Sequence, residues 1–493
     1  MRKRRARTIA TIAAIAAIAM ALILCPAPKL LAQGGFGHLE DASIAPRGLF
    51  RLRTSSVWTR YDQRFAPTGL AALGAPFTAD SLGAMQITEL GAADSLVDAA
   101  AAAPFTLSLG KSRLNAVARE EFVPITLEFG LTRRLAFGLV VPLVRKRVAG
   151  ILTLDSAGAN MGPNPRRRSV AATTTNTILQ QEFLAARTQL QTQLQGCTSN
   201  PGGAGCAALL ARQSEAQALI QSSQAFAANV AALYGTTTND GEAFVPRAQS
   251  AAHVAIAARV ADFNLKYQDL LASTADFVTA IPVGAAGPAG SADIEDYVID
   301  DLGRDSIATK QLLGIGDMEF GVKFMAVDRA TFRLAVASSV RFPTGSRQAP
   351  VGVADLRIGD GGVGFDARAI LEMHRGRLGL LGATTFSMVG SSDALSSNDS
   401  RRIAIDLAPR WHLSAPLAIH GAYSLRDADV TGSMHLVGGG VSFTSVNSWT
   451  AGTRPLPMEM RYTHLETAHG DAGAPKFIRD QLEVRIYYQA RGR

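Results

Sequence analysis

Apolar and polar residues alternate one by one along many segments of this 493-residue chain. In residues 331–343, one set of alternate positions is apolar and the other is polar or small. The apolar set is Phe332, Leu334, Val336, Val340 and Phe342. Because successive side chains of a strand point to opposite faces, this pattern predicts a β-strand with two different surfaces. Its repetition predicts an all-β fold.

Twelve segments show this alternation. They span residues 48–64, 116–131, 134–150, 314–326, 331–343, 362–374, 377–390, 402–413, 416–426, 434–445, 456–467 and 477–488. Most have about ten to fifteen residues, which is sufficient for a tilted strand to cross a bilayer. An even number of strands places the start of the first and the end of the last on the same side of the sheet.

The connections between these segments differ in length in a regular way. Short turns follow the second, fourth, sixth and eighth segments, and long polar loops follow the odd-numbered ones. One connection, 445–455, is long where this order predicts a short turn. Short turns on one side and long loops on the other are typical of outer-membrane barrels. A soluble β-sandwich, with its apolar face inward, is the alternative.

Aromatic residues near predicted strand ends favour the barrel, because aromatic girdles mark the bilayer interfaces. They are Trp58, Trp411, Tyr462 and Tyr488. We therefore predict an antiparallel transmembrane β-barrel of about twelve strands, formed by residues 47–152 and 313–488.

The first 32 residues have the pattern of a secretory signal peptide: a basic start, an apolar run over Ile9–Leu24, and a cleavage site before Gln33. They hold six basic residues and no acidic one, so most of the net charge of +8 belongs to them. A retained anchor and lipidation of Cys25 are the alternatives, although Leu24 is larger than the residue that normally precedes a lipidated cysteine. No basic patch interleaved with aromatic residues remains, so no nucleic-acid partner is expected.

Residues 153–312 interrupt the strand pattern and are predicted to form a mainly helical extracellular insert. Helical periodicity runs through Thr175–Gly196, Ala207–Tyr234 and Gln249–Ser273. The first two stretches carry apolar stripes at Leu179, Phe183, Leu190 and Leu194, and at Leu209, Ala216, Leu219, Phe226 and Leu233. The insert is either a bundle that packs on itself or a cap or plug of the pore.

Two cysteines, Cys197 and Cys206, remain after export and flank a loop rich in glycine around Pro201. In an oxidising compartment such a pair favours a disulfide, which would tie a helical hairpin at its tip. A metal site would require further ligands nearby, and none is adjacent.

Three sequence blocks are informative about family. They are Val123–Thr132, Gly314–Phe324 with its Gly-Ile-Gly-Asp start, and Ser339–Ser346 with its Phe-Pro-Thr-Gly strand end. Together they resemble the outer-membrane transporter family named after the meta-pathway of phenol degradation, which is distantly similar to long-chain fatty acid transporters. The resemblance covers residues 115–150 and 310–488. It implies passage of small, often apolar or aromatic compounds through the bacterial outer membrane.

Two features depart from that family. The helical insert is larger than the family pattern, and the last strand ends in Ile486-Tyr487-Tyr488 followed by five further residues rather than in a terminal phenylalanine. The resemblance implies recognition by the barrel assembly machinery through Tyr488 or tolerance of the tail. The expected partners are outer-membrane lipid, lipopolysaccharide, that machinery and a small-molecule solute.

The polar face of the predicted strands is rich in charge. Its charged members, which are candidates for lining a pore, are Arg51, Arg53, Glu128, Glu319, Lys323, Arg333, Arg341, Asp366, Arg368, Glu372, Asp406, Arg410, Glu459, Arg461, Glu483 and Arg485. Charges of both signs are interspersed, so they can simply pair and fill the interior. Alternatively, the excess of arginine sets a field across the lumen and gives a mild preference for anions.

No sequence pattern indicates catalysis, and no cofactor or metal is predicted. The glycine-rich motif Gly359–Gly364 precedes a strand rather than a helix, so it lacks the context of a dinucleotide site. His464 and His469 lie in an alternating segment and not at helical zinc-site spacing. No Gly-x-Ser-x-Gly elbow occurs, which leaves an outer-membrane hydrolase without a candidate nucleophile.

The sequence therefore predicts a non-enzymatic outer-membrane channel or transporter for small solutes. A barrel that conducts nothing and serves as a structural or adhesive surface protein is the alternative.

Overall fold

The computed structural model describes residues 40–489 apart from short gaps. The gaps are Arg168, 238–239, Asp305, Ala308, 346–361, 391–399, 429–431, 447–456 and Gly473. The chain forms two compact units. The first comprises the described residues of Met1–Leu73, Val117–Ala149 and Lys310–Arg493, and the second those of Gly74–Ala116 and Gly150–Thr309.

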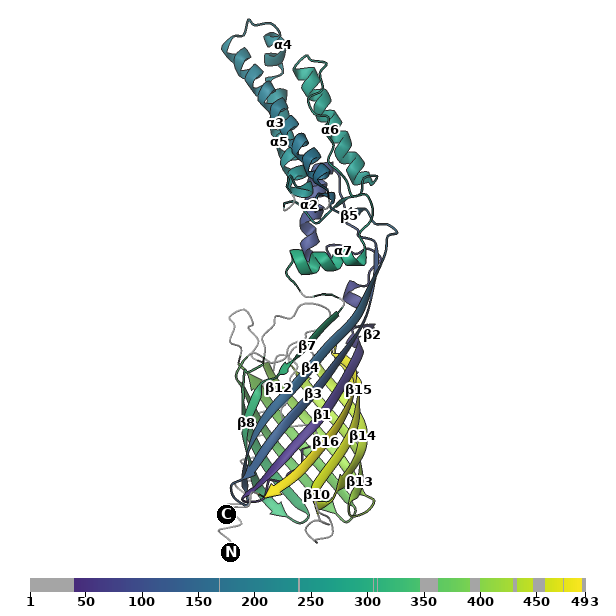
Figure 1. Cartoon of the computed structure of the whole chain (residues 1–493), viewed down its shortest axis with the longest axis vertical. Coiled ribbons are helices and arrows are strands. Elements are labelled where there is room, and N and C mark those ends of the chain that lie inside the picture. Colours follow the sequence, from purple (N-terminus) through teal and green to yellow (C-terminus); the bar gives the residue numbers. More distant parts are fainter. Residues whose placement is uncertain are drawn as a thin grey trace. The chain divides into compact units, whose positions relative to one another are not determined.

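The first unit is a closed antiparallel barrel of twelve long strands, as predicted (Figure 1). The strands are β1 (Leu49–Ala66), β3 (Lys111–Gly130), β4 (Leu135–Asp155), β8 (Met318–Arg329), β9 (Phe332–Phe342), β10 (Gly364–Arg375), β11 (Leu378–Val389), β12 (Ser400–His412), β13 (Leu417–Ala428), β14 (Gly432–Thr444), β15 (Met458–Gly470) and β16 (Pro475–Gln489). Each strand pairs with the next, and β16 closes the barrel by pairing with β1 from Leu49↔Gln489 to Arg64↔Pro475. Two short strands, β2 (Gly69–Ala72) and β7 (Thr309–Ile315), pair with β1 and β4.

The two faces of the barrel wall have opposite polarity. On β3, Leu127 is 45% exposed, whereas the adjacent residue Glu128, on the opposite face, is 3% exposed. The same contrast recurs around the barrel, where exposed positions carry large apolar residues such as Phe320, Phe342 and Leu407. The buried face therefore holds charge and the exposed face is apolar, which is the reverse of a β-sandwich.

The two ends of the barrel are named here by their connections. At the turn end, β1 begins, β16 ends, and short turns join β3 to β4, β8 to β9, β10 to β11 and β12 to β13. At the opposite loop end, β1 leads toward β3 and β4 leads toward β8 through the second unit.

Two predicted long loops at the loop end are wrong. β13 ends at Ala428 and β14 begins at Gly432, and only residues 471–474 separate β15 from β16. The sequence pattern places the polar residues at these strand ends in loops. They continue the ladder instead, as Asp427↔Ser433 shows, because backbone pairing does not require apolar side chains.

The predicted placement of Trp58 near a strand end is also wrong. β1 continues past Trp58 to Ala66, and β3 and β4 reach 20 and 21 residues. These strands are longer than the apolar stretch that the sequence pattern detects.

The second unit is mostly helical. Its helices are η1 (Ala75–Phe77), η2 (Thr88–Leu90), α2 (Gly91–Ala101), η3 (Pro165–Arg167), α3 (Val170–Ser199), α4 (Cys206–Ala211), α5 (Gln213–Tyr234), α6 (Ala251–Leu270), α7 (Ser291–Asp296) and η4 (Tyr297–Asp301), with a small sheet of β5 (Met161–Pro163) and β6 (Phe244–Pro246). Every residue of the two predicted apolar stripes is buried. Phe183, Phe226 and Phe263 pack together with ring centroids 5.1–5.7 Å apart, so this unit has an ordinary apolar core.

Local signals explain where these helices begin and break. α3 begins at Val170, because the Ser169 hydroxyl accepts a hydrogen bond from the Ala172 amide and caps the helix. The predicted continuous helix 207–234 is broken at Arg212, which pairs with Glu215 and Asp269. A disulfide joins Cys197 to Cys206 at the tip of this hairpin.

The second unit includes a segment that the sequence pattern left with the barrel. Gly74–Ala116 belongs to it, and Arg259 of α6 donates hydrogen bonds to the carbonyls of Ala99 and Ala100 at the end of α2. This helix has only eleven residues, at the short end of the window in which helical periodicity can be recognised.

Several predictions fall outside the described residues. They concern the leader 1–32 with Cys25, most of the connection 445–455, the start of the Gly359–Gly364 motif and the side chain of Tyr488. Of the helices in the described ranges, none is both long enough and apolar enough to cross a membrane.

Candidate functional site

The charged residues predicted to line the barrel interior lie in the structure on its buried face. Twelve of the sixteen are less than 9% exposed, and Arg333, Arg410, Glu459 and Arg461 are half-buried. Neighbouring strands contribute pairs of opposite charge, such as Arg341 of β9 and Asp366 of β10 at 2.9 Å. Arg426 and Asp406 form a similar pair at 2.9 Å. Much of the inner charge is thus satisfied along the wall.

A short segment before β1 lies inside the barrel, which the sequence analysis did not predict. Glu40 is 4% exposed, and its carboxylate meets cations from three strands. Lys323 of β8 donates a hydrogen bond to it at 2.8 Å, and Arg368 of β10 and Arg53 of β1 lie 3.4 and 3.8 Å away. A single carboxylate thereby connects three different parts of the wall.

The next residues of this segment contact the opposite set of strands. Asp41 pairs with Arg485 of β16 and lies 3.9 Å from Arg461 of β15. Ser43 accepts a hydrogen bond of 2.9 Å from Arg51 of β1. We call Glu40–Pro46 the lumen segment, since it connects β8 and β10 to β15 and β16 across the interior.

Apolar packing also holds the lumen segment. Ala42 and Ala45 are fully buried, and Ala42 packs in a cluster with Met325, Ala335 and Ile370 on the inner wall. Small side chains let the backbone approach the wall closely. The sequence signal that could have identified the segment is weak: two adjacent acids, Glu40 and Asp41, stand just before the first strand without any alternation.

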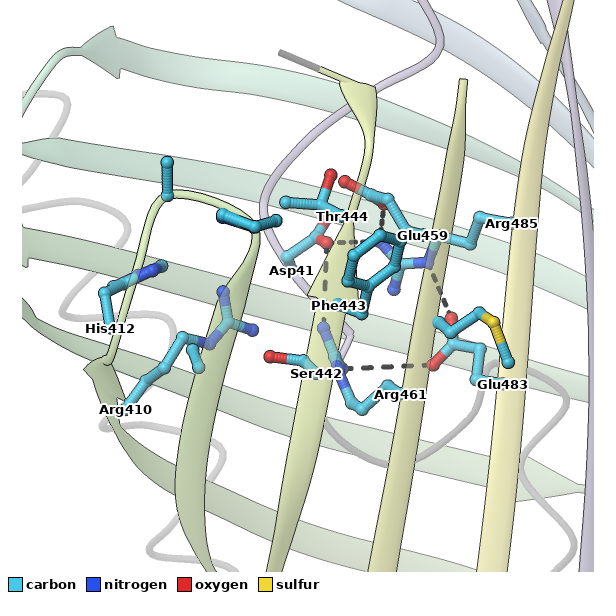
Figure 2. A pocket seen from close by; sticks show the side chains of 14 residues that line it. Asp41, Arg410, His412, Ser442, Phe443, Thr444, Glu459, Arg461, Glu483 and Arg485 are labelled. Atoms are coloured by element: carbon cyan, nitrogen blue, oxygen red, sulfur yellow. Dashed lines mark hydrogen bonds and ion pairs between the residues drawn. The ribbon is translucent and has the colours of Figure 1, made fainter. Parts of the chain in front are cut away.

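The lumen segment and the turn end of the wall enclose a pocket of about 70 Å³ (Figure 2). Its charged lining residues are Asp41, Arg410, Glu459, Arg461, Glu483 and Arg485. Five of these six form one network, in which Arg485 lies 2.7 Å from Glu483 and 3.6 Å from Glu459, and Arg461 lies 3.9 Å from Glu483. The three carboxylates are therefore engaged by Arg461 and Arg485.

Arg410 is the charged lining residue outside that network. Figure 2 shows it beside His412, without a dashed line to any residue drawn. In the described part of the chain its guanidinium makes no ion pair or hydrogen bond, and its Nε atom is buried without a partner. An arginine in this state offers a fork of donors to an anionic group.

A second inner surface, near the loop end, is apolar. Met434, Leu436, Leu465 and Phe477 are buried in one cluster, against which Tyr61 and Phe65 of β1 pack. Thr59, two residues before Tyr61 on β1, accepts a hydrogen bond of 3.2 Å from Arg479. The interior thus combines an apolar wall with a charged pocket at the turn end.

The residues weighed for metal binding or catalysis do not converge. His464 contacts Asp480 at 2.9 Å and Glu466 at 3.3 Å, whereas His469 packs against the rings of His435 and Phe65. Across the described ranges no group of three or more His, Cys, Asp or Glu residues is arranged to hold a metal ion.

No family model matches the chain, and no curated protein matches it. Solved structures that match the chain include an outer membrane channel from Pseudomonas putida F1, at 10% identity and a TM-score of 0.39, covering 93% of this chain and 100% of that chain. The toluene transporter TbuX from Ralstonia pickettii has 8% identity and a TM-score of 0.30, covering 95% and 98%. A FadL homologue from Pseudomonas aeruginosa has 7% identity and a TM-score of 0.28, covering 94% and 100%. The fold of this chain is established by its own strand pairing.

Proposed function

We propose that this protein is a channel of the bacterial outer membrane for the uptake of small solutes with an apolar or aromatic body. The observation that carries the proposal is the inverted polarity of a closed barrel. An apolar outer face suits lipid, and a charged interior suits water and solutes.

The connection pattern supports one orientation. Outer-membrane barrels have their short turns in the periplasm and their long connections outside. The turn end, with the lumen segment, is then periplasmic, and the helical second unit belongs to the extracellular side. The signal-peptide pattern of residues 1–32 agrees with export.

The lumen segment is the proposed gate. Glu40 and Asp41 bind wall cations from β1, β8, β10, β15 and β16, so the segment obstructs the turn end while these contacts hold. Breaking one buried ion pair is costly because it leaves an unpaired charge, so the segment stays in place unless other charged groups replace its contacts. Displacement of the segment would open a path to the periplasm.

The interior chemistry supports the solute class. Tyr61 and Phe65, which are partly exposed over the apolar cluster, offer a surface to an aromatic or aliphatic body, and Arg410 offers donors to an acidic group. The family resemblance of the sequence blocks implies the same kind of cargo. A mild anion preference follows from Arg410.

Single-channel recording of the full chain in planar bilayers tests this proposal. Replacing both segment carboxylates, Glu40→Gln with Asp41→Asn, is expected to raise the open probability about tenfold, since each loses charge-assisted contacts. The matched control is Glu215→Gln with Asp262→Asn, which removes the same two charges from exposed pairs of the helical unit.

The results separate the alternatives. Equal conductance in both double variants would contradict the gate. No conductance in any form would contradict the channel and favour a structural or adhesive barrel. A reversal potential that favours cations would contradict the anion preference.

A further inference from the structure

Three arginines form a row on the outer surface of the barrel. Arg60 of β1 stands directly opposite Arg119 of β3. Arg145 of β4 lies 3.6 Å from Glu121 of β3, and Lys146 lies 3.6 Å from Glu120. The Thr153 hydroxyl donates a hydrogen bond to the Arg113 carbonyl. These three pairs share one antiparallel register, which sets Arg147 opposite Arg119. Three like charges thus occupy consecutive strands at one level.

The row faces outward, away from the charged interior. The strand neighbours Thr59, Ala118 and Val148 are buried, whereas the three arginines are exposed. In the described part of the chain, none of the three makes an ion pair or a side-chain hydrogen bond. Like charges directly opposite each other destabilise a sheet. The arrangement is stable where an anion from outside lies between the side chains.

The height of the row on the barrel wall identifies the surroundings of that anion. At the turn end, Phe50 and Phe129 pack with ring centroids 4.9 Å apart, as an aromatic girdle does. Arg60 lies ten residues further along β1. At about 3.3 Å per residue and a tilt of about 40°, this distance covers roughly 25 Å, the height of the apolar band of such barrels.

The residues between the two levels agree with that spacing. Directly below the row lies the outward pair Glu121–Arg145, and the next outward positions of β3 and β4 are apolar: Val123, Ile125, Leu127, Leu139, Val141 and Leu143. Trp58, two residues before Arg60, is 43% exposed on the same face, where an interfacial tryptophan belongs. The arginine row therefore lies where lipid headgroups begin.

We propose that Arg60, Arg119 and Arg147 bind the phosphate groups of lipid A in the outer leaflet. The proposal rests on the orientation given under the proposed function, in which the loop end is extracellular. The guanidinium fork matches phosphate oxygens in pairs, and three forks in a row fit a headgroup with two phosphates. The nearest acids are partly engaged elsewhere, since Glu121 meets Arg145 and Asp480 accepts hydrogen bonds from Tyr462 and His464.

The test measures binding of bis-phosphoryl lipid A to the full-length, detergent-purified protein by native mass spectrometry. The variant is Arg60→Ser, Arg119→Ser and Arg147→Ser together. The control is Arg133→Ser, Arg134→Ser and Arg377→Ser, which removes three exposed arginines at the turn end. The row variant is expected to bind lipid A at least about tenfold more weakly, whereas the control binds like the wild type.

Binding measurements with other ligands identify the group that the three arginines bind. Monophosphoryl lipid A is expected to bind more weakly than the bis-phosphoryl form, and millimolar inorganic phosphate is expected not to displace it. Equal binding by the row variant would overturn the proposal, as would equal binding of phosphatidylglycerol, which lacks the phosphorylated sugar. Conductance of the row variant, measured separately, reports on the channel itself, so failure of lipid binding and failure of transport are distinguishable.

Discussion

The barrel and the helical unit of this chain arrange the same residue types in opposite ways. In the helical unit, Phe183 and Phe226 are buried and ion pairs such as Lys266–Asp262 are exposed. In the barrel, the pair Arg51–Glu128 is buried while Leu127 and Phe324 are exposed. The helical unit therefore buries apolar residues and exposes charge, whereas the barrel buries charge and exposes apolar residues. The medium outside each unit decides which residues can be exposed.

The largest expected effect concerns the apolar core of the helical unit. Phe226→Ala removes a ring that contacts both Phe183 and Phe263, and is expected to destabilise this unit by about 3–5 kcal/mol. Thermal unfolding followed by circular dichroism at 222 nm measures the helical transition. The heat-dependent gel shift of the barrel is expected to stay unchanged.

The control for that variant is Leu184→Ala, at a residue of the same unit that is 58% exposed. It is expected to change stability by no more than about 0.5 kcal/mol. Loss of the barrel's gel shift in the Phe226 variant would show that the two units unfold together, which contradicts their separation by burial.

A smaller effect is expected from one substitution placed in each region. Leu143 on the barrel and Leu184 on the helical unit are both exposed, at 43% and 58%. Leu143→Arg is expected to cost about 2–4 kcal/mol, because it places a charge near the middle of the apolar band, in lipid. Leu184→Arg is expected to stay within about 0.5 kcal/mol, because its side chain meets water.

Equilibrium folding into lipid vesicles measures the first cost, and the helical transition measures the second. Equal and small costs at both leucines would show that the barrel surface meets water, and would remove the distinction between the two regions.

The sequence predicted the barrel well because its signal is local. Each strand repeats a two-residue period, so Phe320 and Glu319 reveal their faces without any knowledge of the partner strands. The helical stripes through Phe183 and Phe226 are equally local. These patterns were sufficient to predict the number of long strands and which face of each strand is apolar and which is polar.

The features that sequence analysis missed depend on distant contacts. Nothing near Glu40 and Asp41 indicates that Lys323, Arg368 and Arg485 would bind them, because these partners follow hundreds of residues later. The isolation of Arg410 is visible only once the other charges of the pocket have been paired. The opposition of Arg60 and Arg119 requires the register of β1 and β3.

Collision measurements along β3 test the inverted barrel most directly. Single nitroxide labels are placed at each residue from Val123 to Phe129, in the full protein reconstituted into bilayers. Contact with oxygen, which concentrates in lipid, is expected to peak at Val123, Ile125, Leu127 and Phe129. Contact with a water-soluble nickel chelate is expected to be higher at Thr126 and Glu128 than at those positions. The reverse alternation, or water contact at every position, would contradict the account.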